Sequence, residues 1–185
     1  MSSFTYTTAK TDEDLLAILN LQEQNTSSHL TTEEIKTQGF VTVVHNLEAL
    51  KKMNAFEQHI ICKDEENVIA YTLAMTANSK NDLPILFPMF EIFEKILYLG
   101  KPVSLFNYII VGQACVDKSY RGQGILDECY KLFREKYKKS YDFAITEISC
   151  RNVRSLKAHQ RVGFAEVFIY TAPDDEDWSV VIWDW

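Results

Sequence analysis

The sequence has little cysteine, proline or glycine, and it lacks the patterns that identify several common classes of protein. Its four cysteines form no Cys-x-x-Cys pair, so we expect neither a disulfide framework nor a bound metal. No apolar run is long enough to cross a membrane, and the N-terminus lacks the charged and apolar regions of a signal peptide. These absences predict a cytoplasmic protein that has no membrane partner.

Acidic residues outnumber basic ones, but the two are unevenly distributed along the chain. The net charge is −7, which argues against general nucleic-acid binding. Residues 118–161 contain eleven Lys and Arg against five Asp and Glu, which leaves a balance of −13 for the rest. A basic segment suits a polyanionic ligand, and acidic surroundings suit a cationic one. A solvated Lys-rich helix explains the basic segment equally well.

Length and apolar patterning predict one mixed α/β domain. The 185 residues, 46% of them hydrophobic, are enough for a single packed domain over 1–185, and no repeat or linker divides them. We expect helices to start at Thr11 and Thr31, each followed by acidic residues. Strand-like segments are residues 4–8, 58–63, 68–75, 106–116, 142–150, 165–170 and 179–183, and further helical segments are residues 46–53, 123–139 and 152–162.

The most informative stretch joins the strand at 106–116 to the helix at 123–139 through Arg121-Gly122-Gln123-Gly124. The first amides of a helix have no partner within it and lie at the positive end of its dipole, so they can hold an anion such as pyrophosphate. A Walker loop is excluded because no Gly-Lys-Ser/Thr follows, and a dinucleotide fingerprint is excluded because the third glycine is missing. Such a turn caps a helix as often as it binds a ligand.

Two sequence blocks that follow one another along the chain favour ligand binding over simple helix capping at this turn. The segment Arg121-Gly122-Gln123-Gly124-Ile125-Leu126 is similar to the Gln/Arg-x-x-Gly-x-Gly/Ala signature of the GCN5-related N-acetyltransferases (GNAT), although Leu126 replaces the last small residue. The segment Asn152–Phe164 is similar to the second family block, Asn-x-x-Ala/Ser followed by Gly-Phe. The resemblance covers roughly Phe106 to Tyr170 with good specificity.

The resemblance implies a GNAT-like domain with a central twisted mixed sheet of about seven strands and helices on both faces. It further implies direct acetyl transfer from acetyl-CoA to a primary amine of a small molecule or peptide, without a covalent enzyme intermediate. The amide of Val116 is expected to polarise the thioester carbonyl. The expected cofactor-binding residues are Cys115, Val116, Asp117, Arg121, Gly122, Gln123, Gly124, Ile125, Leu126, Asn152, Ser155 and His159.

Two residues are candidates for proton transfer. Glu147 precedes Asn152 in the spacing that some peptide N-terminal acetyltransferases of the family have, so we predict it as the general base; alternatively it faces solvent or pairs with Arg or Lys. His159 stands where many relatives have a tyrosine and is a candidate general acid. It could instead be structural, and the thiolate could leave without a protein acid.

Alternatives to an acetyltransferase stay open. A CoA-binding sensor or a partner-binding module could keep the fold and lose turnover, as Leu126 and His159 would allow. Transfer of a longer acyl chain is a further alternative, for which the apolar segment Pro84–Tyr98 could provide room. This segment either packs over the acceptor cleft or forms a homodimer contact, and the acidic loop Pro173–Asp177 and the early helices would form the other walls of the acceptor site.

Overall fold

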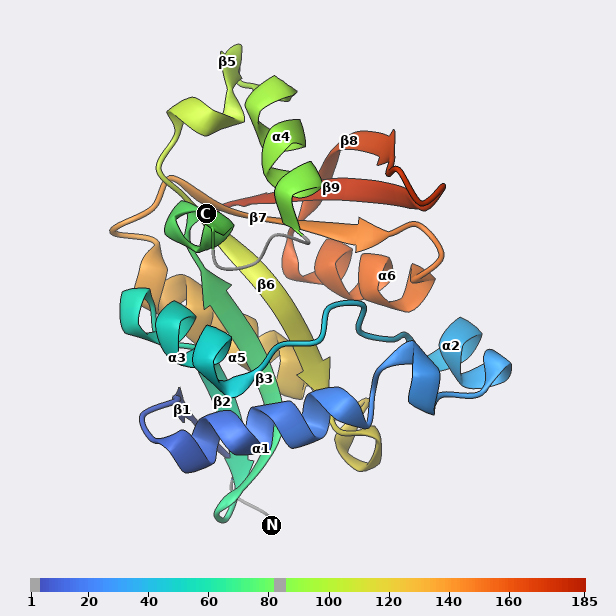
Figure 1. Cartoon of the computed structure of the whole chain (residues 1–185). Coiled ribbons are helices and arrows are strands. Elements are labelled where there is room, and N and C mark those ends of the chain that lie inside the picture. The colour runs from blue at the N-terminus through green and yellow to red at the C-terminus, as the bar shows by residue number, and fades with distance from the viewer. Residues whose placement is uncertain (1–3, 82–85) are drawn as a thin grey trace.

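A computed structural model describes residues 4–81 and 86–185 of the chain (Figure 1). It confirms the mixed α/β class, because a seven-stranded mixed sheet is flanked by helices. The sheet has the order β1 (Thr5–Thr8), β2 (Ile60–Asp64), β3 (Asn67–Met75), β6 (Tyr108–Val116), β7 (Phe143–Ser149), β9 (Asp177–Asp184) and β8 (Ala165–Thr171), and β4 (Leu97–Tyr98) and β5 (Lys101–Pro102) form a separate hairpin. The helices are α1 (Asp12–Glu23), α2 (Thr32–Gln38), α3 (Leu47–Phe56), α4 (Phe87–Lys95), α5 (Ile125–Tyr137) and α6 (Val153–Val162), with short 3₁₀ turns η1 (Ser27–His29), η2 (Ala77–Asn81), η4 (Val103–Leu105) and η5 (Lys118–Tyr120).

Reciprocal caps start the first two helices where the sequence predicted them. The Thr11 hydroxyl accepts the amide of Asp14 at 3.2 Å, and the Asp14 carboxylate accepts the amide of Thr11 at 3.3 Å. Thr31 and Glu34 make the same pair of bonds at the start of α2. Each cap satisfies amides that the helix itself leaves without a partner.

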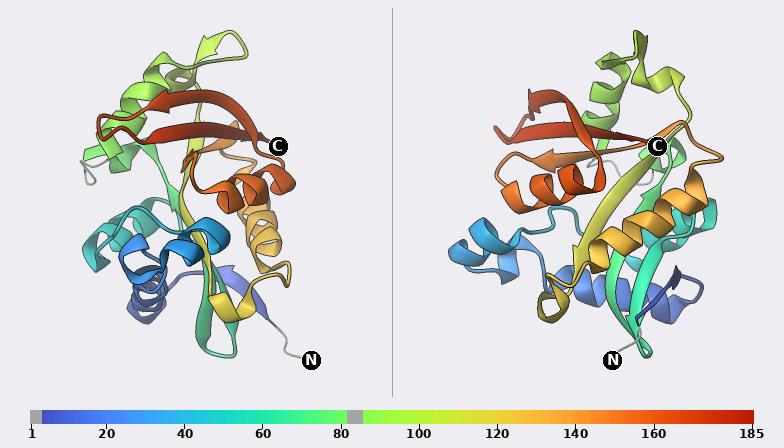
Figure 2. Two further views of the ribbon diagram at one scale, coloured as in Figure 1. Left: turned by 90° about the vertical axis from the view of Figure 1, so that its right-hand side faces the viewer. Right: turned by 180° about the vertical axis from the view of Figure 1, so that it is seen from behind.

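Helices cover both faces of the sheet, as Figure 2 shows, and an apolar core lies between the sheet and the helices on each side. One core contains Ile18 of α1, Leu50 of α3 and Phe93 of α4. The other contains Phe133 of α5 and Phe164, which follows α6. Side chains alternate between faces along a strand, so neighbouring buried residues such as Ala144 and Ile145 of β7 belong to different cores.

The middle of the sheet opens between β6 and β7. These strands pair in parallel over three residue pairs, from Tyr108 with Phe143 to Ile110 with Ile145, and then run apart (Figure 1). The Thr146 hydroxyl donates to the Val111 carbonyl at 2.8 Å where they separate. On its other edge β6 stays paired with β3, and Gly112 is an extra, bulged residue there because Leu73 pairs with Gln113 and Ala74 with Val111. Beyond Ile110, one edge of β6 therefore has no strand partner.

The apolar segment predicted at Pro84–Tyr98 contains α4, while Pro84 and Ile85 lie outside the described residues. Met89, Phe90 and Phe93 of α4 are buried in the core of their own chain. Phe93 meets the ring of Tyr108 edge to face, with centroids 5.8 Å apart. Much of the apolar character of the segment is thus explained by packing within the domain. No helix in the described part of the chain combines the length and apolar composition that a bilayer crossing requires.

Gly163 ends α6 in a conformation that a side chain would disturb. Its φ is +122°, and a Cβ there would lie 2.8 Å from Nε1 of Trp183. We expect Gly163→Ala to lower the free energy of unfolding by about 1–3 kcal/mol in urea titrations, because it adds a clash to backbone strain. Gly100→Ala is the control: φ is +78° and nothing lies within 4 Å, so only the strain of about 1–2 kcal/mol applies. Equal losses in the two variants would contradict the clash.

Candidate active site

A cavity of about 760 Å³ opens where β6 and β7 diverge. Its walls come from the end of β6, the turn before α5, one side of α6 along most of its length, Asn25, and residues 37–41 at and after the end of α2. The predicted cofactor-binding residues line it, with the exceptions of Asp117 and Gln123. The Asp117 carboxylate instead accepts the amide of Ser119 at 2.8 Å and caps η5.

The turn before α5 has the features of an anion site. Gly122 and Gly124 have φ of +80° and +78°, and no atom lies within 4 Å of a Cβ built on either glycine. Within the described chain, the main-chain amides of Gly122, Gly124, Ile125 and Leu126 donate no hydrogen bond to protein, whereas the amide of Gln123 closes the turn at residues 121–122. Asp127 lies in the first turn of α5, but Arg161 pairs with its carboxylate at 2.7 Å and offsets its charge. The turn thus offers several free donors beside the cavity.

The unpaired edge of β6 supplies a second set of main-chain groups. The amide of Asp117 donates to Ile69 of β3 at 2.8 Å. Backbone groups alternate in direction along an antiparallel pair, so those of Ala114 and Val116 point away from β3 and toward the opening. Both residues line the cavity, and the Val116 carbonyl accepts Nε of Arg121 at 3.0 Å. The Val116 amide, expected from the sequence, has an equivalent at Ala114 that the sequence reasoning missed.

Three of the predicted cofactor-binding residues, Asn152 at the N-cap of α6 and Ser155 and His159 within it, line the cavity. The Asn152 side chain caps α6 by accepting the Ser155 amide at 3.2 Å, and it donates to the Phe40 carbonyl at 2.9 Å. His159 is buried with both ring nitrogens engaged, one with the Tyr130 hydroxyl at 2.6 Å and the other with the Ser155 carbonyl at 2.8 Å. Burial lowers the pKa of His159 to about 4, so the ring is neutral at physiological pH.

Cys115 is the thiol on the cavity wall. Burial raises its pKa to about 12, and this outweighs the opposing effect of the nearby Arg121. A thiol with this pKa is almost entirely protonated at neutral pH and is a poor nucleophile. The arrangement is therefore suited to transfer without a covalent intermediate at this residue.

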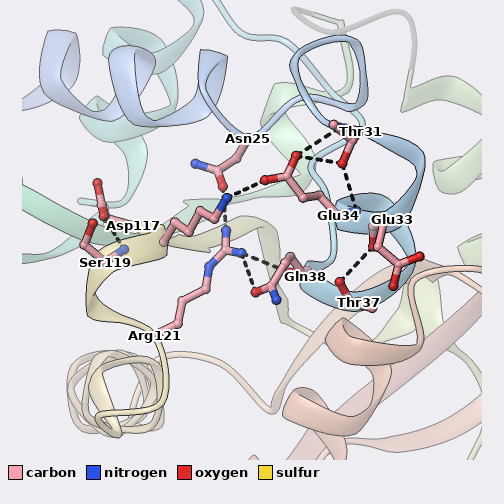
Figure 3. A network of polar contacts seen from close by, with 10 residues as sticks. Asn25, Thr31, Glu33, Glu34, Thr37, Gln38, Asp117, Ser119 and Arg121 are labelled. Carbon is pink, nitrogen blue, oxygen red and sulfur yellow. Dashed lines mark hydrogen bonds and ion pairs between the residues drawn. The ribbon is translucent and has the colours of Figure 1, made fainter.

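Helix α2 is held against the turn by a network that the sequence did not indicate (Figure 3). The Arg121 guanidinium donates to the side chain of Asn25 at 2.5 Å and to the carbonyl and side-chain oxygens of Gln38 at 3.3 Å. Lys118 forms an ion pair with Glu34 of α2. Hydrogen bonds from Lys118 and Thr31 lower the pKa of Glu34 to about 2. We call these contacts the α2 latch. Through them Arg121, one of the expected cofactor-binding residues, is bonded to Asn25, which follows α1, and to Gln38 of α2.

Glu147 lies outside the cavity wall and on the other face of the sheet from His159. It lies on the same face of β7 as Phe143 and Ile145, which belong to the core beside α1, α3 and α4, whereas Tyr130, the partner of His159, belongs to the core beside α5. Its carboxylate accepts the Tyr170 hydroxyl of β8 at 2.5 Å. The alternatives of a solvent-facing Glu147 or a pairing with Arg or Lys do not hold, because Glu147 is half-buried and its partner is a tyrosine.

Burial raises the pKa of Glu147 from its ordinary 4.5 to about 7, although the hydrogen bond from Tyr170 acts in the opposite direction. The carboxylate can therefore gain or lose a proton near neutral pH. Sequence reasoning missed Tyr170, because it and Glu147 are 23 positions apart and meet only through the strand order β7-β9-β8.

Comparison with known proteins identifies the architecture. No protein-family model and no curated protein sequence matches the chain. Among solved structures, an acetyltransferase of the GNAT family from Streptococcus agalactiae has a TM-score of 0.68 at 10% identity, over 98% of this chain and 95% of that one. The chain has the GNAT fold.

Two further structures extend this likeness. The ribosomal-protein-S18-alanine N-acetyltransferase from Escherichia coli has a TM-score of 0.64 at 12% identity, over 98% of this chain and 94% of that one. The NatC complex bound to Gag peptide and CoA includes a chain with a TM-score of 0.68 at 12% identity, over 99% of both chains. At these identities the likeness establishes the GNAT fold and leaves the reaction to be argued from the site.

The α2 latch of this GNAT fold yields a testable expectation. Lys118→Gln removes the cation that pairs with Glu34, so α2 should open more often while the rest of the fold is unaffected. We expect amide hydrogen exchange in α2 to accelerate by about fivefold at most, because the pair is solvent-exposed. Lys131→Gln breaks a comparable exposed pair with Glu128 and should leave α2 exchange unchanged. Identical α2 exchange in both variants would show that the pair does not hold the helix.

Proposed function

We propose that this protein is an acetyl-CoA-dependent N-acetyltransferase that acetylates a primary amine of a small molecule or peptide by direct transfer. The observation that carries the proposal is the continuity of the cavity: it joins the free amides of the α5 turn to the unpaired edge of β6. The GNAT fold and the acetyltransferases that share it add support. We also propose that the protein acts in the cytoplasm.

The residues present suit acetyl-CoA. The amides of Gly122, Gly124 and Ile125 would bind its diphosphate, helped by Arg121 once this side chain leaves the α2 latch. The backbone groups of Ala114 and Val116 would bind the extended arm along β6, and Asn152 would contact it from α6. When bound, acetyl-CoA supplies the acetyl group as an activated thioester.

We assign Glu147 as the proton acceptor. An amine attacks only in its neutral form, so a carboxylate that is ionised near pH 7 can take the proton of the ammonium and become a carboxylic acid. Attack of the neutral amine forms the C–N bond and breaks the thioester C–S bond, so the thiolate of CoA leaves and the remaining nitrogen proton passes to it or to solvent. His159 is not available as the proton donor, because both of its ring nitrogens are hydrogen-bonded within the protein. We infer that it holds α6 against Tyr130 and thereby fixes the cavity wall.

The reaction is tested by measuring thiol release from acetyl-CoA with a panel of polyamines, aminoglycosides and peptides. Release above background with at least one amine, together with a mass increase of one acetyl group on that amine, is the expected result. Binding of CoA without thiol release for any amine would favour the sensor alternative. Release only with longer acyl-CoA donors would favour the acyl-chain alternative.

The cofactor site is tested at Gly124. We expect Gly124→Trp to weaken CoA binding by about tenfold or more in calorimetry, because the indole would occupy the space beside the free amides. Gly100→Trp is a matched control, since Gly100 has the same φ of +78° and the same absence of neighbours within 4 Å, but lies in the β4–β5 hairpin. Unchanged affinity in Gly124→Trp would place the cofactor elsewhere.

Glu147→Gln tests the base by both activity and stability. The amide cannot accept the proton, so thiol release should fall by about 100-fold or more at pH 8, with CoA affinity retained. Because the folded pKa of Glu147 lies above its ordinary 4.5, the parent should lose stability as the pH rises from 4.5 through about 7. The variant should lack that loss, as urea titrations at pH 5 and pH 8 would reveal. Full activity in this variant would remove Glu147 from the mechanism.

A further inference from the structure

The contact between Glu147 and Tyr170 connects strands that are not neighbours. Glu147 pairs across the sheet with Val180 of β9, which in turn pairs with Phe168 of β8. Tyr170 lies two residues further along β8, in the row of Trp178. Paired residues point to the same face, so the phenol crosses β9 diagonally on the face of the α1–α3–α4 core to reach the carboxylate. A contact over this span requires both side chains to be extended toward each other.

The pair has a defined direction of donation. Burial, with a further contribution from the Glu147 charge, raises the pKa of Tyr170 above its ordinary value of 10, so the phenol stays protonated at physiological pH. The hydroxyl therefore donates, and the carboxylate accepts at 2.5 Å. Such a bond stabilises the ionised form of a carboxyl group and fixes which of its oxygens remains free.

Within residues 4–81 and 86–185, no other charged group explains the pKa of Glu147. Burial and the Tyr170 hydroxyl are the influences that act on it, and Asp174 of the β8–β9 loop acts on Tyr170. Ionisable groups on neighbouring elements have partners of their own. These are Glu94 of α4 with Lys80, Glu176 of the β8–β9 loop with Ser149 and Arg151, and His45 with Gln22 of α1.

We propose that Tyr170 is a positioning residue for the base assigned above, holding the Glu147 carboxylate in one orientation and keeping it ionised near neutral pH. This inference rests on the proposed function for its catalytic meaning, whereas the coupling between the two side chains stands on geometry alone. Without the phenol, burial would act on the carboxyl group unopposed, and the protonated, inactive form would dominate at pH 7.

The test compares Tyr170→Phe with the parent in a pH profile of kcat/KM for the amine that gives the highest rate. The acid limb, which in the parent reports Glu147, should move upward by about one pH unit. Activity should then fall about fivefold at pH 7 and return almost to the parent value at pH 9. Any contribution from the amine itself is the same in both proteins and does not create this difference.

Tyr141→Phe is the matched control. It removes another phenol that donates to a carboxylate, that of Glu57 at 2.8 Å, on a different part of the surface. We expect its acid limb to coincide with that of the parent. A Tyr170→Phe profile that is lowered uniformly, with the limb in its original place, would overturn the proposal, because a purely structural contribution predicts that result.

A second measurement does not depend on turnover. Carbon-13 NMR titration of the Glu carboxyl signals, with Glu147→Gln used to assign the resonance, should show a higher midpoint for Glu147 in Tyr170→Phe than in the parent. An unchanged midpoint would overturn the coupling even if the enzyme is active. A parent that releases no thiol with any amine, yet shows the shifted midpoint, would refute the proposed function while confirming the coupling.

Discussion

The separation of β6 from β7 is the constraint on which the rest of the site depends. Inside a sheet, main-chain amides and carbonyls form hydrogen bonds with the neighbouring strands, and leaving these groups unpaired in the interior costs free energy. Here the pairing stops after Ile110 and Ile145, and the Thr146 hydroxyl satisfies the next carbonyl. The cavity gives the remaining groups of β6 access to solvent or to a ligand. An extended ligand with amide groups of its own could replace the missing strand.

The α2 latch closes the same opening from the side. Arg121 and Asn152 each contact the segment that follows α1, the first through Asn25 and Gln38 and the second through the Phe40 carbonyl. Both residues belong to the blocks expected to bind the cofactor. Neither side chain can therefore keep all of its contacts with this segment while it also binds a ligand. In the proposed function, Arg121 would give up its contacts with Asn25 and Gln38 when it binds the diphosphate, and α2 would lose part of its attachment to the turn.

Local signals in the sequence accounted for most elements and for the α5 turn. Thr11 and Thr31 marked helix starts because a cap is a contact between residues three apart, and Gly122 and Gly124 marked the turn because positive φ favours glycine. The contacts that were missed are all long-range. The contacts of Arg121 with Asn25 and of Glu147 with Tyr170 depend on the order of the strands and on where they diverge. The local spacing of apolar residues, in steps of two or four, carries no information about either.

In the proposed function, the residues for cofactor binding and for proton acceptance lie on opposite faces of the sheet. The side of α5 and α6 holds His159, Tyr130 and the free amides, where burial keeps the imidazole neutral and the wall rigid. The opposite side holds Glu147, where burial is strong enough to raise the proton affinity but a phenol prevents it from rising further. A thioester held along β6 would lie between these two environments. Proton acceptance and cofactor binding can then be tuned by different residues, and a change in one set need not disturb the other.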